Sequence, residues 1–400
     1  MELRYKSMGA YQRERGKIKM IFFLSVLVYL LLVSIFVYKR HLVYQTRCKS
    51  DSFFLILSMG VLLLLTCLRG MKVGNDTKSY AHMFNYVARL ESISTMSIEH
   101  INWLNGIEKG YQLIEKAILG ITGNYQIFIS IVAIISYTVL IKFLKMYSPN
   151  LAISVILFYL VFWGNYINLL RQVLALSIVL LAIPMLNKRH VVKFVALILI
   201  ASFFHKTAFA ALGYLLLLYV EPTKSKKIAV LCGAVVLGYG GKITGLLSFL
   251  KIETSYSTIS AGTSIYMDIA KNLLLLGIIV FMNNNIDRGD DELGDGNAKM
   301  SVANKIELID IRVKEWIPVI CLAISILSLG IPAFSRLDLY YSIMLLIIIP
   351  DYFQKKWYIE TNKGIVLFAS ILMLLTFTAG TIIYRPEWVT EYNYYFFWND

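Results

Sequence analysis

The sequence predicts an all-α membrane protein, a polytopic helix bundle of about twelve transmembrane segments with an external loop that carries an amphipathic helix. The first observation is composition: 58% of the 400 residues are hydrophobic and 16% are charged, with a mean hydropathy of +0.65. Soluble domains contain about 25% charged residues. The second observation is arrangement, because the apolar residues form runs close to the roughly 20 residues that cross a bilayer.

The apolar runs give the order of the predicted segments. They lie at 20–38, 52–68, 125–143, 150–165, 169–186, 190–204, 206–220, 228–247, 269–283, 316–332, 337–353 and 364–384. Residues 20–384 are therefore predicted to form a single integral membrane domain, with a basic tail at 1–19 and an aromatic tail at 385–400. The break "FHKT" leaves two interpretations of the sixth and seventh runs open: two short helices, or a re-entrant hairpin.

The distribution of lysine and arginine predicts the orientation in the membrane. Twenty of them fall in one set of connections, at 39–51, 142–149, 187–193, 221–227, 284–315 and 354–363. The positive-inside rule places this set, with its acidic loop 284–315, in the cytoplasm and the loop 69–124 outside. The six basic residues of the tail oppose this assignment. A miscounted segment, an outvoted tail and translation from Met20 remain open as explanations.

Composition and motifs also exclude several classes of function. The net charge of +14 follows from the basic loops, and no basic stripe with interleaved aromatic residues predicts nucleic-acid binding. The four cysteines are widely spaced and are interpreted as small buried hydrophobic residues. The five histidines form no HxxxH or HExxH pattern, and no glycine loop typical of nucleotide sites is present. We therefore expect no metal and no cofactor.

In the predicted orientation, the unusual polar residues gather at the outer face. The stretch "CLRGMKVGNDTKSY" (67–80) follows an apolar run directly and combines cations, a carboxylate and two glycines. Further along the loop, "IEKGYQLIEKAILGI" begins with Ile107 and Glu108, and its apolar positions follow helical spacing. We expect this helix to lie on the membrane surface or to pack over the bundle.

Arg171 is the most unusual of these residues, because it lies in the first turns of a predicted span. A buried guanidinium is costly and needs a partner, and a cation near a helix N-terminus opposes the helix dipole. Asn165, Asn168 and Arg171 recur every three residues and so share one face. Taken singly, Arg69 and Arg336 also fit side chains that extend to the lipid headgroups.

Several arginines and a histidine that face one external cavity suit a diphosphate. A guanidinium group offers a planar fork of donors to phosphoryl oxygens. Without an evident metal site, these cations would have to neutralise the ligand. The sequence therefore predicts an anion site formed by Arg69, Arg171 and Arg336, with His205 in the "FHKT" break nearby.

The motifs resemble those of the EpsG family of bacterial exopolysaccharide proteins, which is related to Wzy-type O-antigen and capsule polymerases. The matching pieces occur in family order: "RGMKVGNDTKSY" (69–80), "IEKGYQLIEKAI" (107–118), "NLLRQVLALSIVLLA" (168–182), "SFFHKTAFAALGYLL" (202–216) and "SRLDLYYSI" (335–343). The basic N-terminus and the acidic loop "NNNIDRGDDELGDGNAK" depart from the family pattern, and they put the topology at the start in doubt.

The resemblance implies a polymerase in the bacterial inner membrane that uses undecaprenyl-diphosphate-linked oligosaccharides as substrates. A flippase and a chain-length regulator of the same pathway are candidate partners, besides membrane lipid. The alternatives are a lipid-linked oligosaccharide flippase and a related glycan ligase. A flippase is disfavoured because the polar residues cluster on one face and the two halves show no internal repeat.

The same resemblance assigns roles within these motifs. The expected catalytic residues are Asp76, Glu108 and His205, of which Asp76 and Glu108 are the leading candidates for a general base. The expected substrate-binding residues are Arg69, Lys72, Tyr80, Tyr111, Arg171, Gln172, Lys206 and Arg336.

Overall fold

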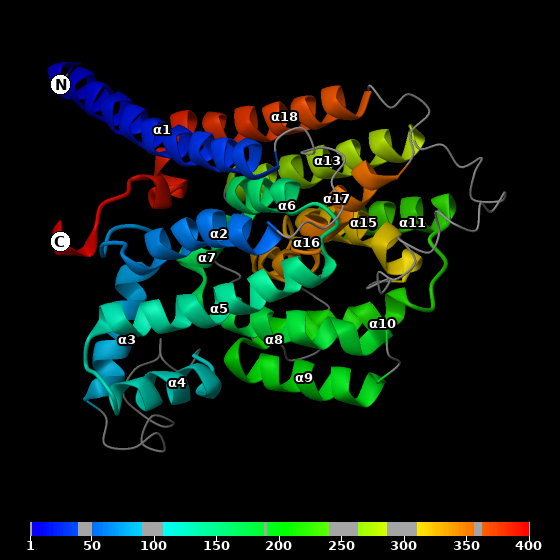
Figure 1. Ribbon diagram of the computed structural model, residues 1–400, viewed down its shortest axis with the longest axis horizontal. Helices are drawn as coiled ribbons and strands as arrows, with labels where there is room; N and C mark the ends of the chain where they lie inside the picture. Colours follow the sequence, from blue (N-terminus) through cyan, green and yellow to red (C-terminus); the bar gives the residue numbers. More distant parts are fainter. Residues whose placement is uncertain are drawn as a thin grey trace.

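A computed structural model describes residues 2–38, 50–89, 107–187, 190–239, 263–285, 310–355 and 362–399. In these residues the regular elements are helices, and the one pairing of extended backbone is an isolated bridge between Arg69 and Phe396. Most of the long helices run along the long axis of the molecule (Figure 1). The all-α prediction is confirmed.

The helices follow the chain in this order: α1 (Glu2–Tyr38), α2 (Asp51–Cys67), α3 (Thr77–Ala88), α4 (Lys109–Leu119), α5 (Tyr125–Tyr147), α6 (Leu151–Leu157), the π-helix η4 (Phe158–Phe162), α7 (Trp163–Asn168), α8 (Leu170–Asn187) and α9 (Val191–Phe204). The second half contains the 3-10 helix η5 (Lys206–Leu212), α10 (Gly213–Leu217), α11 (Lys224–Tyr239), α13 (Thr263–Asn284), α15 (Ile311–Leu327), η6 (Pro332–Leu337), α16 (Asp338–Ser342), α17 (Leu345–Gln354), α18 (Asn362–Tyr384) and the short turns η7 (Pro386–Trp388), η8 (Thr390–Tyr392) and η9 (Phe397–Asn399).

The helices indicate a multi-pass membrane protein. Within the described residues, five stretches are long and apolar enough to cross a membrane, and a sixth is possible if the pair Pro332–Ser342 and Leu345–Gln354, bent by 44°, forms one span. Four further apolar helices are shorter: Asp51–Cys67, Leu170–Leu186, Val191–Phe204 and Lys206–Leu217. Twelve spans therefore remain a prediction, and the predicted run 228–247 lies partly outside the described residues.

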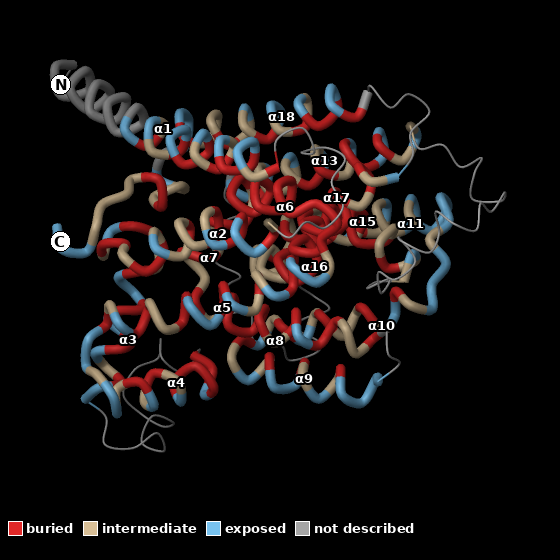
Figure 2. The backbone as a smooth tube through the Cα atoms, in the orientation of Figure 1, coloured by how far each residue is buried: buried red, intermediate tan, exposed pale blue. Residues whose placement is uncertain are grey.

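Burial divides the helices into an inner and an outer set. The segments α6, α16 and α17 are buried over most of their length, whereas α1, α9 and α18 expose apolar side chains on one face (Figure 2). Exposed leucine, isoleucine and phenylalanine on a bundle of this composition are what lipid contact requires. The inner helices are also the broken ones, because η4 interrupts the segment between α6 and α7, and the 44° bend separates α16 from α17.

The predicted loop 69–124 contains two helices that lie side by side, α3 and α4. The sequence predicted α4 but not α3. Both pack through a second, smaller apolar core that includes Tyr80, Phe84, Tyr111 and Phe128. Whether α4 lies outside the membrane remains a prediction, and residues 90–106 of this loop lie outside the described part of the chain.

The aromatic C-terminal tail returns to the end of α2. The backbone N–H of Gly70 donates to the carbonyl of Tyr395 at 2.9 Å, and that of Phe397 donates to the carbonyl of Leu68 at 3.0 Å. The hydroxyl of Tyr394 donates to the carbonyl of Leu65 at 2.8 Å. The tail therefore fixes the turn that follows α2, and both chain ends lie at the same end of the bundle as α3 (Figure 1).

Candidate functional site

The turn between α2 and α3 is shaped by its two glycines. Gly74 has a φ of +88°, which L-residues rarely adopt. Gly70 lies directly against the ring of Tyr395, where any Cβ would overlap the ring. The backbone N–H of Lys72 donates to the Tyr395 hydroxyl at 2.5 Å. The side chain of Lys72 is exposed, so the backbone of this residue, rather than its charge, contributes to the turn.

Asp76 ends this turn and occupies the N-cap position of α3, yet its side chain makes no capping hydrogen bond. The carboxyl group is half-buried, and burial raises its pKa, whereas the positive charges of Arg336 and Arg171 lower it. Two guanidinium groups from distant segments thus act on one carboxylate. The carboxylate is placed to accept a proton or to orient the arginines.

Glu108 forms the most connected contact of the site. It precedes α4, with one carboxylate oxygen 2.8 Å from Nη1 of Arg171. The other oxygen lies 2.9 Å from Nδ1 of His205 and accepts from the backbone N–H of Lys206 at 3.0 Å. Burial opposes ionisation of this carboxyl, but the contacts with His205, Arg171 and the Lys206 backbone outweigh it and lower its pKa to about 2.

Through these contacts, Glu108 holds several segments of the site together. It ties α4 to the start of α8 and to the break between α9 and η5, as the sequence motifs around each segment suggested. With its pKa near 2 it is a poor proton acceptor at neutral pH. The Nε2 atom of His205, by contrast, is buried and has no hydrogen-bond partner among the described residues. The side chain of Lys206 is exposed.

Arg171 and Arg336 meet around Tyr80. A hydrogen bond joins Tyr80 to Arg171, and the charge of Arg336 acts on the same phenol. The amide of Gln172 donates to the backbone carbonyl of Arg336, which fixes the segment η6 against α8. These contacts bring Tyr80 and Gln172 to the segments that carry Arg171 and Arg336, and a role of the four residues in binding substrate stays a prediction.

Arg69 occupies a different position from the other two arginines. Its side chain is fully buried, with Nη1 donating to the Thr66 carbonyl at 2.5 Å and Nη2 to the Ile167 carbonyl at 3.3 Å. These carbonyls lie at the C-terminal ends of α2 and α7, where a cation is favourable. The contacts support a bracing role, and a role of Arg69 in binding substrate stays a prediction.

Glu115 is a buried carboxyl group that the sequence did not single out. It is fully buried on α4, and neither oxygen has a hydrogen-bond partner among the described residues. Burial raises its pKa to about 8, against the opposing charge of Arg171 and the contact with Tyr111. Its position in "IEKGYQLIEKAI" is seven residues after Glu108, about two helical turns beyond the N-cap of α4. That spacing was the available signal.

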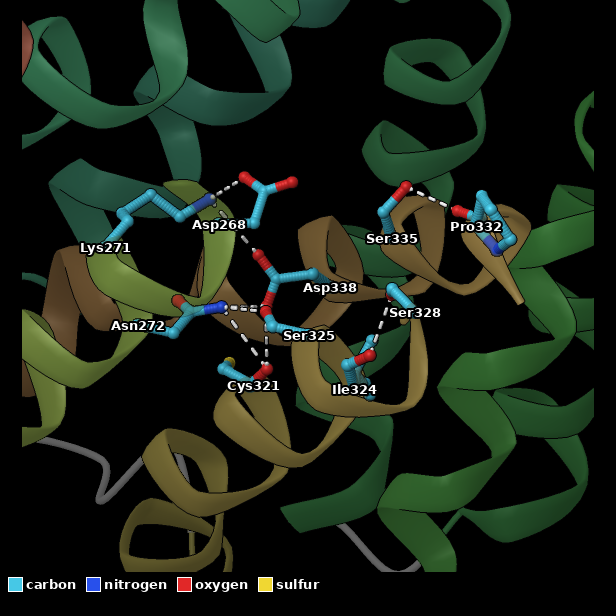
Figure 3. A network of polar contacts seen from close by, with 10 residues as sticks. All are labelled: Asp268, Lys271, Asn272, Cys321, Ile324, Ser325, Ser328, Pro332, Ser335 and Asp338. Atoms are coloured by element: carbon cyan, nitrogen blue, oxygen red, sulfur yellow. Dashed lines mark hydrogen bonds and ion pairs between the residues drawn. The ribbon is translucent and has the colours of Figure 1, made fainter. Parts of the chain in front are cut away.

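A second polar network lies deeper in the bundle and was also missed (Figure 3). Lys271 on α13 lies 3.2 Å from Asp268 and 3.5 Å from Asp338. Asn272 donates to the Asp338 carboxylate at 3.3 Å and to the Ser325 hydroxyl at 2.6 Å. Asp338 belongs to the motif "SRLDLYYSI" and follows Arg336 by two residues. Its contacts with Lys271 and Asn272 therefore connect this network to the motifs recognised in the sequence.

The comparisons with known proteins are consistent with the motifs. The model of the EpsG family matches residues 52–396. Neither the curated proteins nor the solved structures include a match to the chain. The matched region begins with α2 and ends in the C-terminal tail, so it includes every segment that contributes to the site.

Proposed function

The chain belongs to the EpsG family, a family of Wzy-like polysaccharide polymerases, and on that premise we propose that it polymerises lipid-linked oligosaccharide repeat units. The growing glycan moves from undecaprenyl diphosphate to the sugar end of the next lipid-linked unit. The reaction takes place at the outer face of the bacterial cytoplasmic membrane, with the chain crossing that membrane about twelve times and α4 on the outer side.

The observation that supports this proposal best is that the positive charges of Arg171 and Arg336 both act on Asp76 and on Tyr80. The two arginines come from α8 and η6, and Glu108 holds the first of them from a third segment. Guanidinium groups bind phosphoryl oxygens through parallel hydrogen bonds. A diphosphate is the group on the donor substrate that needs such a site.

The reaction is a displacement at the anomeric carbon of the donor. A hydroxyl oxygen of the acceptor forms the new glycosidic bond, the bond from that carbon to the diphosphate oxygen breaks, and the hydroxyl proton passes to a base. Negative charge develops on the leaving diphosphate, where Arg171 and Arg336 stabilise it without rearranging. Positive charge develops on the sugar ring, as in other glycosyl transfers.

Two groups remain as candidates for the base, Asp76 and Nε2 of His205. The positive charges of both arginines act on Asp76. Nδ1 of His205 lies 2.9 Å from the Glu108 carboxylate, and Nε2 has no hydrogen-bond partner among the described residues. Glu108 is a positioning residue in this scheme, because its carboxylate is shared among three partners. The predicted partners, a flippase and a chain-length regulator, would supply repeat units and limit polymer length.

Chain growth by the purified protein tests the proposal. The protein is incorporated into lipid nanodiscs and given undecaprenyl-diphosphate-linked repeat units without nucleotide sugar, and the products are separated by length. A ladder of longer lipid-linked glycans, with release of undecaprenyl diphosphate, is expected. Transfer to a different acceptor only would favour a ligase, and movement of the substrate across vesicles without new bonds would favour a flippase.

A further inference from the structure

A cavity of about 250 Å³ lies beside the site, between η4, α7, α13, α18 and the C-terminal tail. Its polar lining comes from Asn168, Asp268, Lys271, Thr381 and Glu391. Trp388 and Phe377 add aromatic surface. We propose that this cavity binds one neutral or amino sugar ring of the lipid-linked substrate. This inference rests on the proposed function, because it names a subsite for the same reaction.

The composition of the lining favours a sugar. Carboxylates accept hydrogen bonds from ring hydroxyls, and side-chain amides both accept and donate them. An aromatic ring provides a flat apolar surface for the C–H face of the sugar. Pockets for drug-sized ligands are about 300–1,000 Å³, so this volume suits one ring rather than a whole repeat unit.

The charges in the cavity select against acidic sugars. Lys271 is already paired with Asp268 at 3.2 Å and with Asp338 at 3.5 Å. Glu391 is buried, and its carboxyl group accepts from the amide of Asn168 at 3.4 Å. A uronic acid would bring a further carboxylate towards Asp268 and Glu391, whereas neutral hydroxyls or an ammonium group would pair with them.

Two connections join the cavity to the site of the proposed chemistry. Asn168, in the cavity wall, accepts from the backbone N–H of Asn75 at 2.5 Å, next to Asp76. Lys271 reaches Asp338, two residues beyond Arg336. A sugar held here would therefore touch Asn168 and Lys271, whose partners lie one residue from Asp76 and two residues from Arg336.

Binding of simple glycosides tests the inference independently of polymerisation. The probes are methyl α-D-glucopyranoside, methyl α-D-galactopyranoside, methyl N-acetyl-α-D-glucosaminide and methyl α-D-glucuronide, measured by saturation-transfer NMR with the protein in nanodiscs. At least one of the first three should bind with a Kd on the order of 1 mM, as expected for so small a ligand. The glucuronide should bind at least about 10-fold more weakly, because it adds a carboxylate beside two others.

Two variants locate the binding, and one serves as control. Ser264 is exposed at the cavity lining, so Ser264→Trp should block the cavity without removing a buried contact, and Glu391→Gln should weaken binding about 10-fold or more. Tyr266→Trp changes an exposed residue two positions along α13 and should leave binding unchanged. Binding that survives both cavity variants, or no binding by any glycoside, overturns the inference.

A photocrosslinking amino acid at position 264 shows whether the bound sugar ring belongs to the acceptor or to the donor substrate. Capture of a single lipid-linked repeat unit assigns the ring to the acceptor, and capture of a longer glycan assigns it to the donor. Glycoside binding that is lost in Ser264→Trp, in a protein that forms no polymer, would support the sugar site while rejecting the polymerase. Polymer formation without cavity-dependent binding would do the reverse.

Discussion

The positive charges of Arg171 and Arg336 both act on Asp76, whose carboxylate is not used to cap α3. A solvated loop carboxylate would be dispensable, and its replacement would change the free energy of unfolding by about 0.5 kcal/mol or less. A carboxylate that takes a proton or orients two arginines is needed for turnover. Replacement of Asp76 therefore distinguishes a solvated loop carboxylate from one that takes part in the reaction.

We predict that Asp76→Asn leaves the protein folded in the membrane but lowers polymer formation about 100-fold or more if the carboxylate is the base. The measurement is the rate of chain growth in nanodiscs at equal protein concentration. Asp290→Asn, in the predicted acidic loop and outside the described residues, is the control and should retain full activity. A normal rate with Asp76→Asn would leave His205 as the remaining candidate for the base.

Glu108, at the N-cap of α4, and Glu115, within α4, respond oppositely to pH. The pKa of Glu108 is lowered to about 2, so its contribution to stability is present above its usual pKa of about 4.5 and is lost as the pH falls towards 2. The pKa of Glu115 is raised to about 8. In the folded protein Glu115 keeps its proton while the unfolded chain loses it, so stability falls as the pH rises from about 4.5 to 8.

We predict that Glu115→Gln stabilises the protein at neutral and alkaline pH, by at most about 3 kcal/mol at pH 7, with little effect near pH 4. The amide preserves the shape of the protonated side chain and cannot ionise. The measurement is thermal unfolding in nanodiscs from pH 3 to 9. Glu108→Gln is the matched comparison and should lose stability mainly above pH 4.5. Parallel pH profiles for wild type and Glu115→Gln would contradict the assignment.

At the scale of elements, the sequence predicted most helices and the break at "FHKT", but not the breaks at η4 and before α17. Long apolar runs specify α5 and α18, because each run is continuous and matches the bilayer. The helix α3 was missed because "TKSYAHMFNYVA" follows a glycine-rich polar turn and is only half apolar. It is helical because Tyr80 and Phe84 bury themselves against α4 and α5, a tertiary effect that local spacing does not reveal.

Site residues were predictable where a polar or charged side chain interrupts an apolar run. They were not predictable where tertiary packing determines their position. A guanidinium in an apolar run marks Arg171, and the break at "FHKT" marks His205. Burial of Arg69 beneath the site depends on which carbonyls end α2 and α7, and that is set by the fold. The role of the C-terminal tail was also invisible, since the contacts of Tyr395 join residues more than 300 positions apart.

We predict that Tyr395→Ala loosens the turn from Arg69 to Asp76 and lowers polymer formation about 10-fold, because it removes both the ring against Gly70 and the hydroxyl that the Lys72 N–H contacts. Loss of one hydrogen bond costs about 1 kcal/mol, so Tyr395→Phe should have a much smaller effect. The measurement is chain growth together with protease cleavage in the turn. Equal effects of Phe and Ala would assign the role to the hydroxyl alone.

At the scale of the whole molecule, the helical bundle has two distinct ends. One end holds α3, α4 and both chain termini, and the opposite end holds the connection between α10 and α11 (Figure 1). That connection leads into Lys224, the first residue of α11, in one of the segments that the positive-inside rule assigns to the cytoplasm. The arrangement fits the predicted orientation, and it places the N-terminus at the end that the alternation of spans requires.

We predict that cysteines introduced at these two ends differ in their access to an impermeant reagent. Lys78 on α3 and Lys224 at the start of α11 are both exposed, so each position can react if the reagent reaches it. In a background without native cysteines, Lys78→Cys should be labelled in intact cells, and Lys224→Cys should be labelled only after the membrane is permeabilised. Labelling of both in intact cells, or the reverse pattern, would contradict the orientation. The site around Asp76 would then face the cytoplasm, where the diphosphate of an untransported repeat unit would be the accessible substrate.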